Sequence, residues 1–175
     1  NVIYYFTGGD KIIGTTTLQS NTWYHIALVR GAKRAALYLD GSLEGVAADT
    51  GTFQNGGVLR VGHRYQTVTA GFYPYSGYVE DMRITKGLVR YPFTPPNETV
   101  SNTTATKLIA CHDSTVTTDG TGTHTITAYG NAASIAFGPH SAMRSTYFDG
   151  TGDYLEVDNS TEFQHSTNDL SIDFW

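Results

Sequence analysis

The sequence predicts an all-β fold, a sandwich of antiparallel strands. Polar and apolar side chains alternate with a period of two through residues 22–39, and residues 30–34 form a short basic connection in the middle, as in a β-hairpin. Asp40 and Gly41 follow directly and favour a tight turn into the next strand. The composition agrees, because 19 Gly, 12 Tyr and 8 Phe suit aromatic-rich strands joined by many turns.

Short strands are expected along the whole chain, bounded by Gly, Asn, Asp or Pro. Besides the hairpin, the first part of the chain predicts strands at 2–6, 11–17, 42–47, 58–61, 78–84 and 88–91, with a long loop at 63–77. The second part predicts strands at 107–112, 123–129, 146–150, 153–157 and 170–175, with one helical turn within 159–165. Proline residues at 92–96 stop regular pairing between these two parts.

Charge and length exclude several classes of protein. The 175 residues suit about one domain, and 11 Lys and Arg against 16 Asp and Glu give a net charge of -5. This balance argues against a nucleic-acid partner or an anionic membrane surface. No apolar run approaches the roughly 20 residues that span a bilayer, so no membrane insertion is expected. The chain begins at Asn1 rather than Met, so we expect it to be either a processed protein or, as the favoured interpretation, a piece of a longer one.

A series of motifs resembles a known family. Five segments resemble the C-terminal half of a concanavalin A-like, laminin G-type jelly-roll domain. They are residues 21–30, 37–41, 59–62, 77–87 and 90–96. Four later segments resemble the N-terminal half of the same kind of domain. They are residues 106–113, 124–132, 145–157 and 170–175. Among domains of this kind, the segments most resemble those of bacteriophage tail fibres and environmental surface proteins. The resemblance implies a concanavalin A-like jelly-roll sandwich of two antiparallel sheets.

The two halves stand in permuted order. Residues 1–96 resemble the C-terminal half, 97–106 form a linker, and 107–175 resemble the N-terminal half. Three arrangements follow: the chain spans a junction between tandem repeats, its second half completes the first by circular permutation, or its second half completes a neighbouring chain by strand exchange. The tandem array is the favoured interpretation.

No catalytic residues are predicted, and the protein is expected not to be an enzyme. Relatives that hydrolyse β-glucans carry carboxylates that point together from alternate positions of one strand, whereas Glu80 and Asp81 are neighbours that point to opposite faces. The histidines lack the spacing of a zinc site, and no G-x-S-x-G nucleophile motif is present.

A structural calcium is the only cofactor that the resemblance implies. In such domains a carboxylate of the penultimate strand and oxygens near the start of the domain hold the ion. Glu80 or Asp81 matches the former, and Asp149 or the Gly150 carbonyl matches the latter. The alternative is a buried carboxylate paired with an arginine or with backbone amides.

A ligand site is expected where aromatic rings gather with polar side chains, because flat rings stack on sugar C–H groups. The long stretch 63–77 carries such a cluster, comprising Arg64, Tyr65, Gln66, Phe72, Tyr73 and Tyr75. The alternative is that these rings cover the rim of the sandwich or a subunit interface.

The resulting functional hypothesis is a non-catalytic lectin-like module for recognition or adhesion. Its partner would be a glycan or a cell-surface receptor, and its setting a larger repeat-containing fibre or surface protein, extracellular or on a virion. The alternative is a structural spacer or a self-assembling filament subunit joined by strand complementation, with no glycan ligand.

Overall fold

The computed structural model describes residues 1–6, 10–51, 58–66, 71–88, 94–98, 100–140, 143–163 and 169–175. The strands of the first part are β1 (Tyr4–Phe6), β2 (Asp10–Ile13), β3 (Ile26–Gly31), β4 (Arg34–Leu39), β5 (Ser42–Ala48), β6 (Leu59–Val61), β7 (His63–Gln66), β8 (Gly71–Pro74), β9 (Ser76–Val79) and β10 (Met82–Lys86). Those of the second part are β11 (Thr106–Ala110), β12 (Ile126–Tyr129), β13 (Ala133–Ile135), β14 (Ser145–Asp149), β15 (Tyr154–Val157) and β16 (Leu170–Phe174), with the 3₁₀ turn η1 (Thr161–Phe163).

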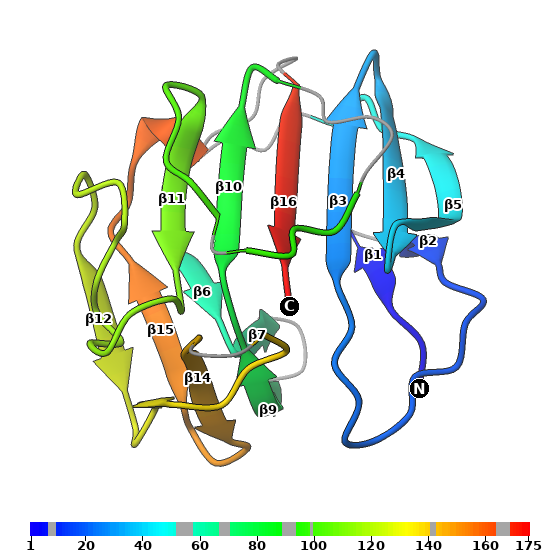
Figure 1. The fold of residues 1–175 in the computed structure, drawn as a ribbon. Helices are drawn as coiled ribbons and strands as arrows, with labels where there is room; N and C mark the ends of the chain where they lie inside the picture. The colour runs from blue at the N-terminus through cyan, green and yellow to red at the C-terminus, as the bar shows by residue number, and fades with distance from the viewer. Residues whose placement is uncertain are drawn as a thin grey trace.

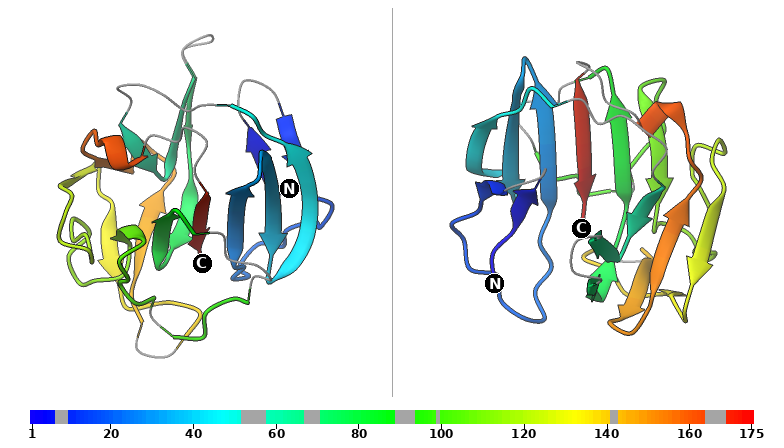
Figure 2. Two further views of the ribbon diagram at one scale, coloured as in Figure 1. Left: turned by 90° about the horizontal axis from the view of Figure 1, so that it is seen from above. Right: turned by 180° about the vertical axis from the view of Figure 1, so that it is seen from behind.

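One layer of the molecule is a six-stranded antiparallel sheet. Its order is β11-β10-β16-β3-β4-β5, so β16 lies between β10 and β3 (Figure 1). The other layer consists of smaller antiparallel ladders, β12-β15-β6 and β13-β14-β9, together with the hairpins β1–β2 and β7–β8 (Figure 2). The predicted all-β sandwich is confirmed.

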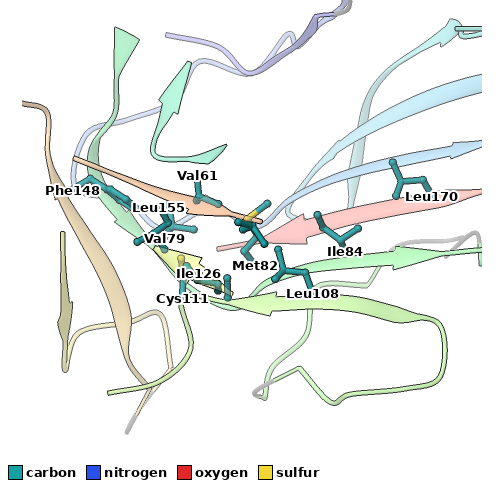
Figure 3. Packing of buried hydrophobic residues seen from close by; sticks show 12 residues of the cluster. Val61, Val79, Met82, Ile84, Leu108, Cys111, Ile126, Phe148, Leu155 and Leu170 are labelled. Atoms are coloured by element: carbon teal, nitrogen blue, oxygen red, sulfur yellow. The ribbon is translucent and has the colours of Figure 1, made fainter. Parts of the chain in front are cut away.

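The main core fills the space between the two layers. The large sheet contributes Met82, Ile84, Leu108, Ala110 and Leu170, and the opposite layer contributes Val61, Val79, Ile126, Phe148, Leu155 and Val157 (Figure 3). These side chains are at most 7 % exposed, and Phe148, Leu108, Leu155 and Val157 are completely buried. Apolar side chains at alternate strand positions therefore hold the layers together.

The predicted hairpin is confirmed, with a later start. β3 begins at Ile26 and pairs with β4 in register. Ala32 and Lys33 both have positive φ, and so do Asp40 and Gly41 in the next connection, as two-residue hairpin turns require.

Strands from the two halves of the chain pair with one another. β16 pairs with β10 and β3, β11 pairs with β10, β14 pairs with β9, and β15 pairs with β6. Val100, in the predicted linker, is buried and donates its backbone N–H to the carboxylate of Asp81. Within this chain, residues 107–175 thus add strands to sheets that residues 1–96 begin, while the tandem-repeat interpretation stays a prediction.

Two expected elements differ in the structure. The loop prediction for residues 63–77 was wrong, because the β-forming residues there pair as β7–β8 and continue into β9. The strand expected at 78–84 is broken at Glu80 and Asp81, where Asp81 takes a φ of 51°. Aspartate tolerates this left-handed conformation, and the break lets β9 pair with β14 while β10 joins the large sheet. The strand expected at 88–91 falls largely outside the described residues.

Gly62 is expected to be intolerant of a side chain. It has a φ of 84°, and a Cβ atom there would lie 2.5 Å from the ring of the fully buried Phe148. Gly62→Ala should lower the free energy of unfolding by about 2–4 kcal/mol, since backbone strain and overpacking both contribute. Gly122→Ala is the matched control, because Gly122 also has positive φ but has open space around it. Chemical denaturation should show a clearly larger loss for Gly62→Ala, and equal losses would contradict the packing argument.

Candidate functional site

Two hairpins bring an arginine and three aromatic rings together on the surface. In β7–β8, Arg64 lies directly opposite Tyr73, which places their side chains on the same face. Arg64 Cζ lies 5.8 Å from the centre of the Tyr73 ring and 4.6 Å from that of Phe6, and Nη1 donates to Tyr4 Oη at 3.1 Å. We call Tyr4, Phe6, Arg64 and Tyr73 the aromatic platform.

The rings of the platform remain open to solvent. Tyr4 is 51 % exposed, Phe6 42 % and Tyr73 53 %. Strand alternation explains this for β1, because Ile3 and Tyr5 turn inward to pack near Ile12, while Tyr4 and Phe6 face outward. Exposed rings held around a cation offer flat apolar faces with a hydrogen-bonding group at their centre.

The other predicted ligand residues have different surroundings. Tyr65, Gln66 and Phe72 belong to β7 and β8 by their backbones, and their side chains fall outside the described structure. The described contacts of Tyr75 are with residues other than Arg64. Its hydroxyl donates to the Tyr78 carbonyl, and its ring meets the Phe148 ring edge-on. The structure therefore brings together Arg64 and Tyr73 among the described side chains of the predicted cluster.

Sequence reasoning missed Tyr4 and Phe6. The alternation of the segment V-I-Y-Y-F could have indicated that these two rings face outward, because its inward residues are Ile3 and Tyr5. Nothing local to that segment indicates that it lies beside Arg64, about 60 residues further along the chain.

A second feature is a cavity of about 300 Å³ at the junction of β9 and β10. It is lined by Glu80, Asp81, His112, Asp113, Ser114, Met143 and Arg144. Glu80 is 1 % exposed, and neither of its carboxyl oxygens has a hydrogen-bond partner among the described residues. Burial, and to a lesser extent the neighbouring Asp81 carboxylate, together raise the pKa of Glu80 to about 8. Burial also raises the pKa of Asp81, opposed by the hydrogen bond from Val100.

The backbone holds Glu80 firmly in this position. Its N–H donates to the Trp175 carbonyl at 2.8 Å, and its carbonyl accepts from the Trp175 N–H at 2.9 Å. A Cβ atom at Gly138 would overlap the Glu80 carboxyl group, so a side chain there would require that group to move. Glu80 is thus a buried carboxyl group, with a raised pKa, held beside the point where the chain changes sheets.

The predicted calcium ligands do not form one site. The register of β14 on β9 places Thr146 opposite Val79 and Asp149 opposite Ser76. Asp149 therefore lies about four residue steps, or about 13 Å, from Glu80 along the ladder, and Gly150 lies further still. The described residues contain no group of three or more His, Cys, Asp or Glu side chains that could hold a metal. Since calcium takes 6–8 oxygen ligands, these residues do not fit an ion shared between them.

The family can now be assigned. The family model described as the concanavalin A-like lectin/glucanases superfamily, Laminin_G_3, matches residues 2–89. The chain belongs to this family. The match covers β1 to β10, including both hairpins of the aromatic platform, and confirms the predicted jelly-roll class. No curated protein and no solved structure matches the chain.

The Laminin_G_3 assignment carries coarse functional information. Domains of this kind are typically non-catalytic, fit a lectin-like role and are often extracellular. In the parts of the chain that the structure describes, no helix has the length and apolar character needed to cross a bilayer.

Proposed function

We propose that this Laminin_G_3 domain is a lectin-like recognition or adhesion module, without catalytic activity, that binds carbohydrate at the aromatic platform. The observation that carries the proposal is the set of exposed rings of Tyr4, Phe6 and Tyr73 around Arg64. Aromatic faces stack on the C–H faces of sugars, and polar groups beside them fix hydroxyl orientation. Both hairpins sit on a rigid sandwich, where binding sites commonly lie.

The proposed setting is outside the cell or on a virion surface, within a larger repeat-containing fibre or surface protein. Family membership supports an extracellular place. The net charge of -5 and the low share of charged residues, 15 %, support a sugar or protein partner over a nucleic acid.

A second candidate function is assembly of a filament or spacer through strand pairing. It is favoured by β5, which is the last strand at one side of the six-stranded sheet. β5 also exposes Leu43 by 56 % and Val46 by 45 %. An outer strand with exposed apolar side chains can accept a strand from another chain.

Glycan binding tests the first proposal against the second. We expect the wild-type protein to bind members of an immobilised glycan panel, and Tyr73→Ala or Phe6→Ala to weaken that binding by at least about tenfold. Tyr129→Ala is the matched control, because Tyr129 is an exposed ring, 39 % accessible, whose described ring contact is with Tyr154 and not with a residue of the platform.

The contrary outcome is equally specific. Folded wild-type protein that binds no glycan, yet self-associates in a way that Val46→Lys abolishes, would replace the lectin proposal with the filament proposal. Analytical ultracentrifugation of both proteins gives that measurement.

A further inference from the structure

We infer that the aromatic platform recognises the carboxylate of an acidic sugar, so that its ligand is a glycan carrying a uronic or sialic acid. This inference rests on the proposed function, because it names the class of sugar that the same site would bind. It follows from how Arg64 is held and from how three other arginines in strands, Arg30, Arg60 and Arg83, are used.

Arg64 presents one side of its guanidinium group for binding. Nη1 donates to Tyr4 Oη, and the rings of Phe6 and Tyr73 lie near the guanidinium at 4.6 Å and 5.8 Å. Among the described residues, Nε and Nη2 have no hydrogen-bond acceptor, and no carboxylate forms an ion pair with Arg64. Nε and Nη2 form the fork that matches the two oxygens of a carboxylate.

Three other strand arginines already donate from Nε to a carboxylate of the protein, and Arg83 and Arg60 donate from Nη2 as well. Arg83 donates to Asp173 through Nε at 3.1 Å and Nη2 at 2.6 Å. Arg60 donates to Glu156 through Nε at 3.0 Å and Nη2 at 2.8 Å. Arg30 donates to the Asp49 carboxylate through Nε at 3.1 Å. Arg64 differs from all three because the described carboxylates leave its fork open.

The Arg60 site is an internal comparison with nearly the same parts. Arg60 lies over the Tyr154 ring at 5.5 Å, and Tyr154 stacks on Tyr129 at 4.4 Å with the ring planes 9° apart. There Glu156 supplies the carboxylate from the strand beside β6. Among the side chains that the structure describes, the aromatic platform has the rings and the arginine but no carboxylate beside them, so an acidic ligand would supply that charge.

The physical basis is the strength of a two-pronged, charge-assisted hydrogen bond. Nearby rings restrict the guanidinium and shield it partly from water, which strengthens its interaction with an anion. A pyranose ring stacked on Tyr73 would place its own carboxylate within reach of the adjacent Arg64. A neutral sugar would keep the stacking and lose the ion pair.

The test uses matched sugar pairs. The probes are oligosaccharides ending in glucuronic, galacturonic or sialic acid, together with the same oligosaccharides after reduction of the carboxyl group to an alcohol. We expect the wild-type protein to bind at least one acidic probe about 10- to 100-fold more tightly than its reduced form, measured by titration calorimetry. Arg64→Gln should abolish this preference and leave the thermal unfolding midpoint nearly unchanged.

Arg34→Gln is the matched control, since it removes the same charge from an exposed position at the β3–β4 turn. Arg34→Gln should keep the preference for acidic over reduced probes. This result would separate recognition by the Arg64 fork from a general electrostatic attraction between the protein and an anionic sugar. Equal binding of acidic and reduced probes, lost in Tyr73→Ala, would overturn the inference and leave the proposed function standing. Binding of no sugar in either form would overturn both.

Discussion

Replacing Glu80 by glutamine is expected to stabilise the protein at pH 8. In the folded state burial raises the pKa of Glu80 to about 8, from an ordinary value of 4.5. Between these values the folded protein holds a proton that the unfolded chain releases, so the free energy of unfolding falls as pH rises. The loss approaches about 1.4 kcal/mol per pH unit, is absent below pH 4.5 and is complete above pH 8. Glutamine keeps the shape of the neutral acid and removes this loss.

The measurement is urea denaturation of both proteins at intervals from pH 4.5 to pH 9. The difference in unfolding free energy between Glu80→Gln and wild type should grow with pH and reach about 2–4 kcal/mol at pH 8. His112 and His140 lie close to the neighbouring Asp81 and are unchanged in the variant. Glu98→Gln, at an exposed glutamate, is the control and should show no such growth. A constant difference across this range would show that Glu80 is ionised in the fold.

Replacing Asp173 by asparagine is expected to destabilise the protein by about 3–5 kcal/mol. Asp173 is fully buried in β16, accepts two hydrogen bonds from Arg83 and lies 3.7 Å from His25 Nε2. Arg83 is itself only 4 % exposed, so loss of the carboxylate leaves a charge buried without its counter-charge.

Glu156→Gln provides the comparison for Asp173→Asn. The pair of Arg60 and Glu156 has similar geometry, but its side chains are 28 % and 23 % exposed. Its loss should cost less than about 1 kcal/mol, because water screens and replaces the interaction. Similar losses for the two variants in chemical denaturation would show that Asp173 is not buried in the sheet as described.

Period-two patterning predicted the strands with the clearest alternation. The hairpin of β3 and β4, with positive φ at Asp40 and Gly41, follows from residues that are neighbours in the chain. The break at Asp81 did not follow, because the alternation of residues 78–84 runs unbroken in the sequence while tertiary pairing divides it between two sheets.

The candidate site was predictable only in part, for a similar reason. Arg64 and Tyr73 lie within ten residues of each other, so their clustering is visible in the sequence. Phe6 joins them through tertiary packing, which no local pattern reports. Conversely, Glu80 and Asp149 match a family pattern in type, but the strand register keeps them apart. Residue types can be carried over from a pattern, whereas distances depend on register.

The central place of β16 has a consequence for the order of events during synthesis. β3 and β10 belong to the first half of the chain, yet each pairs on one side with β16, whose residues are Leu170–Phe174. A nascent chain that has reached only Lys86 therefore carries two strands whose shared partner has not been made. Folding must wait for that late segment, so the many pairings between residues distant in sequence favour slow folding. Until then the unpaired strands of different nascent chains can join one another, which makes chaperone protection during translation valuable.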